Sequence, residues 1–498
     1  TIAKLPQANP GGDLSLSCSD YDIPNGKWLP VELTNTITGD YESILWSTNG
    51  DGTFNDPTAV APFYNPGLAD IWKGDIELCV TVQGVEACQT SDTKCMMLYI
   101  PQQLIYFDVD GWWGISSYLD TDLPLVSQVM DPLVLIPGSQ HLVTMVDKQG
   151  KYFWAEPIPA QGTLSNWMPI GYKTKIKNPP ACLPIYGDSL IDQTFTVSGA
   201  FTFLPVLTNV PVPISDLLAG HLNDILLIFD WSNKVLWTPQ AADFTELYPG
   251  RAYLMVNRVA TGAYTIEYPH FVPDAPHLYP ATLPKAAVIN NSPWQQESNT
   301  AVPHIMLFDD KAMNKLTTGD ILGVFDSQGN CYGQVEYGNT EEVFSLIAMG
   351  RNNQLRDERA GFETGEKMFM RKYNAITQGH QAVTFVYDTD FPSSDGLFAE
   401  NGASRVVDII ETATSVNDDH TLNNLAIYPN PANSELNIKA SGNIRKVELL
   451  NSVGQIVMSQ SFDANQIRLD VSQYKAGLYI VAITQSTGDV ITRRVTIY

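Results

Sequence analysis

The stretch that decides the fold lies near the C-terminus and reads Tyr474-Lys475-Ala476-Gly477-Leu478-Tyr479-Ile480-Val481. A glycine turn followed by aromatic and β-branched residues is typical of a strand that begins at a turn. Outward from it, residues 447–457 read as a strand, a turn at Gly454 and a second strand, and residues 490–498 read as a final strand. Residues 425–498 are therefore predicted to form a small β-sandwich.

The same segment opens with Tyr428-Pro429-Asn430-Pro431. Two prolines two positions apart remove backbone donors, so we expect an extended opening turn here and a strand only from residue 434 onward. Farther along, Leu469-Asp470-Val471-Ser472 reads as the end of another strand.

Taken in order, these features resemble a type A C-terminal sorting domain of the type IX secretion system. The residues that carry the resemblance, from the opening turn to the basic last strand, are Pro429, Asn430, Pro431, Gly454, Gly477, Leu478, Tyr479, Arg493 and Arg494. A β-sandwich without a targeting role is the alternative, because each of these residues also suits an ordinary turn or core position.

The resemblance implies a secreted protein that reaches the cell surface of a Bacteroidota-like bacterium. It implies as partners the type IX translocon and an outer-membrane shuttle barrel protein, which would bind the domain after the cargo crosses the periplasm. Such domains are often removed when the cargo is attached to lipopolysaccharide, so that attachment is a further expectation. Residues 477–481 and 493–498 are the expected docking elements, through an exposed strand edge or a loop.

Composition supports a folded, modular chain. The 498 residues are 44% hydrophobic and 17% charged, and a prior of roughly 150 residues per domain predicts several modules. The net charge of −25 repels phosphate backbones and anionic lipid headgroups, which argues against nucleic-acid and membrane-surface binding. No apolar run approaches the ~20 residues of a membrane span. The sequence opens without a basic, apolar leader, so we expect that a signal peptide was removed or that the sequence starts after it.

Short β-branched and aromatic runs punctuated by Asn-Gly, Asp-Gly and Pro predict an all-β protein of tandem sandwich-like modules. The expected division is an immunoglobulin-like sandwich at 10–101, a duplicated β module at 103–270, a surface-protein β module at 285–400, a linker at 401–424 and the sandwich at 425–498. Within the linker, residues 404–413 are expected to form a short helix.

The first module is marked by Trp46 in an apolar run, followed by the Gly-rich turn Asn49-Gly50-Asp51-Gly52. This pattern predicts a core-anchored strand that enters a hairpin. It resembles the immunoglobulin-like or PKD-like repeats of Bacteroidota surface proteins, which specify a fold and no activity.

The second module contains a degenerate repeat. Asp147, Lys151 and Trp154 align with Asp230, Lys234 and Trp237, and the run 133–135 is aligned with the run 226–228. Two similar β units packed together would bury apolar surface that neither unit could bury alone. In the third module, residues 319–325 and 361–366 resemble another module of Bacteroidota surface proteins, to which no activity is attached.

Six cysteines indicate disulfides and an oxidising compartment. Four of them lie in the first hundred residues, and we favour Cys18 with Cys88 and Cys79 with Cys95. A direct Cys79–Cys88 bridge across a hairpin is the alternative. Irregular spacing and the lack of a nearby histidine argue against a metal site.

One catalytic signature occurs in the front of the chain. Gly187-Asp188-Ser189-Leu190 matches the nucleophile motif of Gly-Asp-Ser-Leu hydrolases, and Asp274 and His277 match their Asp-x-x-His pair. The residues fall among β repeats, whereas that chemistry belongs to an α/β fold, so we predict no catalytic residues and no enzyme. A surface hydrolase stays the alternative.

Two binding alternatives also remain. Alternating carboxylates at 108–110, 120–122 and 388–390 could hold calcium, although none continues into a twelve-residue calcium loop and solvated turns explain them better. One of the adjacent Trp112 and Trp113 could be exposed as a sugar-stacking platform, and glycan binding would require exposed aromatics around Trp112, Trp113 or Trp154. We therefore predict a surface protein for adhesion or surface structure, with no cofactor or metal, and keep glycan binding as an alternative.

Overall fold

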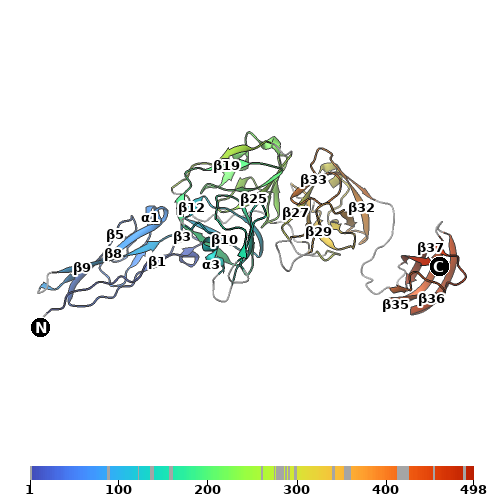
Figure 1. The fold of residues 1–498 in the computed structure, drawn as a ribbon, viewed down its shortest axis with the longest axis horizontal. Helices are drawn as coiled ribbons and strands as arrows, with labels where there is room; N and C mark the ends of the chain where they lie inside the picture. The colour runs from blue at the N-terminus through green and yellow to red at the C-terminus, as the bar shows by residue number, and fades with distance from the viewer. Residues whose placement is uncertain are drawn as a thin grey trace.

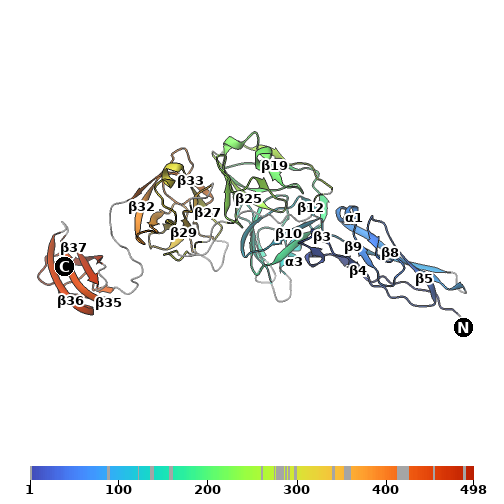
Figure 2. The same ribbon diagram turned by 180° about the vertical axis from the view of Figure 1, so that it is seen from behind.

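The computed structural model describes residues 3–498 except 87–89, 122, 135–139, 156–160, 259–261, 274, 276–284, 286–288, 290–291, 297–299, 339–342, 353–359, 412–425, 452–454 and 486–489. Strands dominate the described residues and the helices are short, so the predicted all-β class is confirmed. None of the described helices combines the length and apolar character that a membrane crossing needs. Figures 1 and 2 show the modules from the two sides.

Module 1 (residues 3–101) is a sandwich of two sheets with the orders β1-β9-β8-β5 and β4-β7-β6. Its elements are β1 (Leu14–Ser15), η1 (Cys18–Asp20), β2 (Tyr21–Asp22), β3 (Lys27–Trp28), β4 (Val31–Glu32), β5 (Tyr41–Thr48), β6 (Thr53–Phe54), β7 (Phe63–Asn65), α1 (Leu68–Lys73), β8 (Asp75–Gly84) and β9 (Ser91–Tyr99). Alternate residues of β8 point into the core, and Trp46 of β5 is only 2% exposed. The two sheets confirm that this module is a β-sandwich, and its likeness to immunoglobulin-like repeats stays a prediction.

The Gly-rich turn of module 1 is held by a buried carboxylate. Asp70 at the start of α1 accepts hydrogen bonds from the backbone N–H groups of Asp51 and Gly52, at 2.9 and 3.0 Å. The Tyr64 hydroxyl donates to the same carboxylate at 2.5 Å. Because a buried carboxylate needs several donors, this network explains why the turn adopts one shape.

Module 2 (residues 102–273) consists of two halves. The first contains β10 (Gln103–Phe107), β11 (Gly111–Ile115), β12 (Leu119–Thr121), α2 (Val126–Val129), α3 (Asp131–Val134), β13 (Leu142–Val146), β14 (Tyr152–Trp154), β15 (Gln161–Gly162), β16 (Tyr172–Ile176), β17 (Ala181–Ile185) and β18 (Gly187–Ser189). The second contains β19 (Thr194–Val197), β20 (Phe201–Pro205), β21 (Val212–Pro213), α4 (Ile214–Leu217), η3 (Leu222–Asp224), β22 (Ile225–Asp230), β23 (Val235–Trp237), β24 (Glu246–Leu247), β25 (Ala252–Asn257) and β26 (Tyr264–Glu267).

The two halves share one topology. The order β11-β16-β13-β14 in the first sheet corresponds to β20-β25-β22-β23 in the second. Trp154 and Trp237 end equivalent strands, as the repeat predicted. The alignment of 133–135 with 226–228 is wrong, because Leu133 and Val134 lie in α3 and residue 135 lies outside the described residues. A three-residue apolar run has no period, so it does not distinguish a strand from a buried helix.

The halves pack closely where β11 meets β25. Ile115 forms an isolated antiparallel bridge with Arg251, and a Cβ at Gly114 would lie 1.8 Å from the carbonyl oxygen of Ala252. Ser116 Oγ accepts from the Val206 N–H at 2.9 Å and donates to the Arg251 carbonyl at 2.5 Å. Glycine at 114 is required by this backbone approach.

Module 3 (residues 292–411) is built on one seven-stranded sheet of order β29-β28-β31-β32-β33-β27-β30. Its elements are β27 (Pro303–Phe308), α5 (Asp310–Met313), β28 (Ile321–Phe325), β29 (Cys331–Glu336), β30 (Ser345–Met349), β31 (Phe369–Tyr373), β32 (His380–Tyr387) and β33 (Gly402–Glu411). The helix expected at 404–413 is wrong, because 402–411 are strand β33, parallel to β27. The sheet thus reaches into the expected linker, whose residues 412–424 lie outside the described part of the chain.

Modules 2 and 3 share a hydrophobic cluster. Trp112 and Trp231 of module 2 belong to it together with Ile305 and Ala403 of module 3. Lys173 is also buried at this joint, where its Nζ donates to the Ala301 carbonyl at 2.9 Å, and burial lowers its pKa to about 8. A shared core makes the joint a packed interface rather than a hinge.

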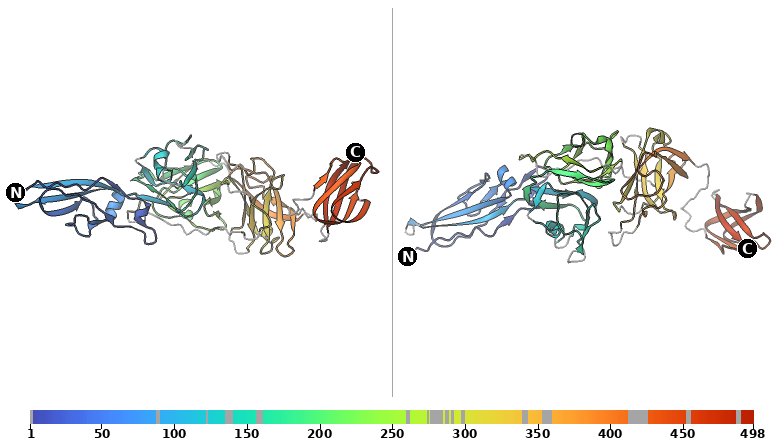
Figure 3. Two further views of the ribbon diagram at one scale, coloured as in Figure 1. Left: turned by 90° about the horizontal axis from the view of Figure 1, so that it is seen from below. Right: turned by 45° about the horizontal axis from the view of Figure 1, so that its top comes forward.

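The tail domain (residues 426–498) is a single sheet that folds over one core. Its strands are β34 (Ala426–Tyr428), β35 (Glu435–Leu450), β36 (Ile456–Asp470), β37 (Gly477–Gln485) and β38 (Val490–Ile497). The order is β34-β35-β37-β38, and β36 pairs along β35. Leu436 and Leu449, from the two ends of β35, are fully buried in the same cluster, so both ends of the long strand contribute to one core. Figure 3 shows the tail domain, in red, from two further directions.

Candidate functional site

The opening turn of the tail domain is bonded to its last strand. Asn430 accepts a hydrogen bond from the Thr496 N–H at 2.9 Å and donates to the Arg494 carbonyl at 3.1 Å. Two residues on, the Ala432 N–H donates to the Thr496 carbonyl and the Tyr498 N–H donates to Ala432, both at 2.8 Å. The proline-flanked turn and the C-terminal strand, far apart in the sequence, therefore form one unit.

The expected docking elements, residues 477–481 and 493–498, are largely paired with neighbouring backbone. Strand β37 is paired with β38 from Gly477 onward and with β35 from Ile480 onward, so residues 480–481 have no free backbone edge. The outer edge of β38 is covered by Asn430 and Ala432 along residues 494–498. Residues 480–481 and 494–498 therefore have no free backbone edge for a further strand, whereas residues 477–479 are paired with β38 and not with β35.

The other predicted sorting residues occupy different environments. Tyr479 is buried, and its hydroxyl donates to the Lys475 carbonyl at 2.8 Å. Leu478 is 50% exposed, and Arg494 is exposed at the end of the sheet. Arg493 donates to the carbonyl of Thr492 at 3.0 Å. Gly454 lies outside the described residues.

Sequence reasoning missed two outward-facing apolar residues of the tail domain, the half-buried Leu450 and the exposed Ile456. Both lie at the end of the β35–β36 hairpin, where Leu450 is paired with Ile456. The signal that could have found them is parity, since Leu449 is a core position and its neighbour Leu450 must then face outward.

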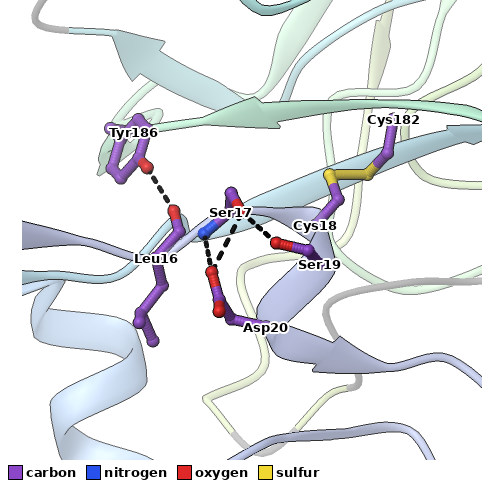
Figure 4. The surroundings of a disulfide bond; sticks show 7 residues. All are labelled: Leu16, Ser17, Cys18, Ser19, Asp20, Cys182 and Tyr186. Carbon is purple, nitrogen blue, oxygen red and sulfur yellow. Dashed lines mark hydrogen bonds between the residues drawn. A yellow bond between two sulfur atoms is a disulfide. The ribbon is translucent and has the colours of Figure 1, made fainter. Parts of the chain in front are cut away.

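Module 1 is bonded covalently to module 2 (Figure 4). Cys18 of η1 forms a disulfide with Cys182 of β17, across a sequence separation of 164 residues. Beside it, the Tyr186 hydroxyl donates to the Leu16 carbonyl at 2.6 Å. The turn that carries Cys18 is fixed by Asp20, which accepts from the Ser17 N–H at 2.8 Å and from its hydroxyl at 2.9 Å.

The disulfides correct the predicted connectivity. Cys79 is joined to Cys95 between the paired strands β8 and β9, as expected. The pairing of Cys18 with Cys88 is wrong, because Cys18 is bonded to Cys182, and Cys88 itself lies outside the described residues. The direct Cys79–Cys88 bridge is excluded as well. Spacing within the first hundred residues could not reveal a partner that folding brings in from the next module.

The hydrolase motif is not built as a nucleophile site. Ser189 lies in strand β18, paired with Leu119 of β12, whereas a nucleophile elbow requires a turn from a strand into a helix. Asp274 and His277 lie outside the described residues.

A buried histidine and serine pair in module 3 is also arranged for structure. His304 Nδ1 accepts from the Ala399 N–H at 2.9 Å, so the proton is on Nε2, which donates to Ser404 Oγ at 2.7 Å. Ser404 in turn donates to the Ser393 carbonyl at 2.5 Å. A base must accept the serine proton, and here the histidine donates instead. Burial lowers the pKa of His304 to about 4, which keeps it neutral.

The tryptophans considered for sugar binding and the possible metal ligands have structural roles. Trp112 and Trp113 are 1% and 3% exposed, so neither is a sugar platform, and Trp154 is half-buried against Tyr152. Among the described residues, metal-ligating atoms come together at Glu77, Cys79 and Cys95, but both sulfurs belong to the disulfide.

The carboxylates considered for calcium have neighbours within the protein. Asp388 accepts from the Asp390 N–H at 3.0 Å and lies 3.6 Å from Arg405. Asp108 lies 3.6 Å from Lys285, and Asp122 lies outside the described residues.

An open groove of about 840 Å³ crosses β31 and β32 of module 3, between loops 326–329 and 394–396. Phe369 in this groove is 42% exposed. The Arg371 guanidinium lies 4.5 Å from the centre of the Phe325 ring, and its Nη1 is buried without a hydrogen-bond partner in the described part of the chain. An exposed aromatic ring in an open groove can stack against the flat face of a ligand.

Comparison with known protein families identifies the tail domain. Residues 426–498 match the family model of the secretion system C-terminal sorting domain. No curated protein matches the chain.

Solved structures resemble the chain only weakly. CopC from Methylosinus trichosporium OB3b is similar at 15% identity over 15% of this chain and 92% of that chain, with a TM-score of 0.12. A tetra-tandem repeat from the extending region of a large adhesion protein is similar at 11% identity over 99% of each chain, with a TM-score of 0.13. Sidekick-1 immunoglobulin domains 1–5 are similar at 11% identity over 100% and 98% of the two chains, with a TM-score of 0.16. At such TM-scores we infer neither fold nor function from them.

The family match confirms the predicted localisation. The protein is exported through the type IX secretion system to the cell surface or the extracellular space, and its tail domain interacts with that machinery.

Proposed function

We propose that modules 1–3 are the displayed part of this cargo and serve adhesion or surface structure, without catalytic activity. The observation that carries the proposal is the sorting-domain match at 426–498, behind three β modules joined to one another. The Cys18–Cys182 disulfide and the core shared by modules 2 and 3 suit a part that must keep its shape outside the cell. The described histidine and serine pair is hydrogen-bonded in the wrong sense for a nucleophile.

The proposed route includes two further partners. An outer-membrane shuttle barrel protein would receive the tail domain during export. Lipopolysaccharide would then be attached to the cargo when the tail domain is removed. Both proposals rest on the resemblance of residues 426–498 to sorting domains.

The test of this function is deletion of residues 426–498, followed by fractionation of cells that have a type IX system. We expect the truncated protein to accumulate in the periplasm. The matched control fuses residues 426–498 to a monomeric periplasmic reporter, which should then reach the surface or the medium. Unchanged surface display of the truncated protein would contradict the proposal.

Glycan binding is a second candidate function, and the groove of module 3 favours it. Phe369 offers a ring face for stacking, in a groove of about 840 Å³ that Arg371 also lines. A glycan array with the secreted protein would reveal binding that Phe369→Ala abolishes. Ile376, which is 77% exposed and outside the groove, provides the control Ile376→Ala. If both variants bind equally, the groove is not the site.

A further inference from the structure

Four side chains of the tail domain lie in one row across its strands. Leu450 of β35 is paired with Ile456 of β36 on one side and with Ile480 of β37 on the other. Ile480 is in turn paired with Arg494 of β38. Directly paired residues carry their side chains on the same face, roughly 5 Å apart. The register of β35 and β36 shifts by one residue between Leu449 and Leu450, so Ile456 lies at a bulge beside Leu450, at the end of the row. Leu478, two residues before Ile480, extends it on the same face.

This face is the outer one. The neighbouring residues Leu449, Val481 and Val495 are fully buried in the core, which puts the row on the opposite side of the sheet. Leu478 is 50% exposed and Ile456 is 57% exposed, while Leu450 and Ile480 are half-buried. An antiparallel sheet with one solvated face normally carries polar residues there, and grouped apolar residues mark an interaction site.

Charge indicates the chemistry of the partner. Residues 426–498 contain seven Lys and Arg against five Asp and Glu, a net charge of +2, whereas residues 1–425 carry −27. Arg494 stands at the end of the row, with Arg493 next to it in the chain. Arg493 is paired with the core residue Val481, so of the two arginines only Arg494 lies on this face. A surface that buries the aliphatic side chains and places carboxylates opposite Arg494 is complementary to it.

The backbone around β38 argues against addition of a strand at that edge of the sheet. Asn430 and Ala432 already occupy the outer edge of β38 along residues 494–498. A strand added to that edge would have to displace them, while the row needs no rearrangement.

We propose that the row Leu478, Ile480, Leu450 and Ile456, ended by Arg494, is the surface by which the tail domain docks on a component of the secretion machinery. The partner surface is apolar and bordered by carboxylates. This inference rests on the proposed function, because it specifies how the same domain is recognised.

The test uses the full chain in cells with a type IX system. Leu478→Asp combined with Ile456→Asp places charges in the row at exposed positions and should reduce the exported fraction at least tenfold, with accumulation in the periplasm. Ile191→Asp combined with Ile376→Asp introduces the same charges at exposed aliphatic positions of the front modules and should export normally. Thermal unfolding of the purified chains compares their folding.

Arg494→Glu keeps the test decisive if the double variant unfolds the tail domain. It alters an exposed charge without touching an apolar residue, and we expect a several-fold loss of export, while Lys475→Glu at another exposed position should have none. Normal export of a folded row variant or of Arg494→Glu, with the 426–498 deletion retained in the periplasm, overturns the docking row alone. Export of the deletion variant overturns the proposed function itself.

Discussion

The front modules and the tail domain build their cores by the same strand alternation but treat their remaining apolar surface differently. In the front, Trp112 and Ile305 from neighbouring modules meet in one cluster, and a disulfide joins module 1 to module 2. In the tail domain, Leu478 and Ile456 stay on the outer face. The front modules therefore bury apolar side chains against one another at their joints, although single aliphatic residues such as Ile191 and Ile376 stay exposed, whereas the exposed apolar residues of the tail domain are grouped on one face of its sheet.

The largest effect is expected from the covalent joint. Replacing Cys18 and Cys182 together by serine should lower the free energy of unfolding of the front modules by about 5 kcal/mol, because the bond restricts a long segment of the unfolded chain. The Cys79 and Cys95 double variant, with a sequence separation of 16, should cost only about 3 kcal/mol. Guanidinium unfolding followed by tryptophan fluorescence measures both.

The tail domain contains no cysteine, so a reductant should leave its transition unchanged and move only that of the front modules. Equal shifts of the unfolding transitions of the tail domain and the front modules would show that the reductant does not act through the disulfides.

A smaller effect should follow acidification of module 3. The pKa of His304 is near 6.5 when unfolded and about 4 in the folded protein. Its contribution is therefore fully present above pH 6.5 and is lost as the pH falls to 4, which amounts to about 3 kcal/mol. Thermal unfolding between pH 7 and 4 measures this loss, and His304→Gln should flatten the dependence.

The tail domain has no histidine and provides the internal control. A tail transition that falls as steeply as that of module 3 over the same pH range would show that another group is responsible.

The smallest effect concerns the bond between the opening turn and the last strand. Asn430→Ala removes two hydrogen bonds to the backbone of β38 and should destabilise the tail domain by about 1 to 2 kcal/mol. Amide exchange at Thr496 should become faster. Asn433→Ala, at an exposed position in the same turn, should change neither quantity. If both variants behave alike, Asn430 does not hold the strand.

The all-β class of the modules and the export of the protein could be predicted from the amino-acid sequence alone. Glycine turns and β-branched runs are local signals, so the strands around Trp46 and after Gly477 could be predicted from neighbouring residues. The sorting domain was legible for the same reason, because its motif is read along the chain.

Which distant residues meet became clear from the folded chain alone. The Cys18–Cys182 bond, the strand at 402–411 and the row from Ile456 to Arg494 each depend on pairing between segments that the sequence separates. Local patterns predict that a segment is a strand, but the partner of a strand is chosen by the burial and hydrogen bonding of the whole sheet, which no short stretch encodes.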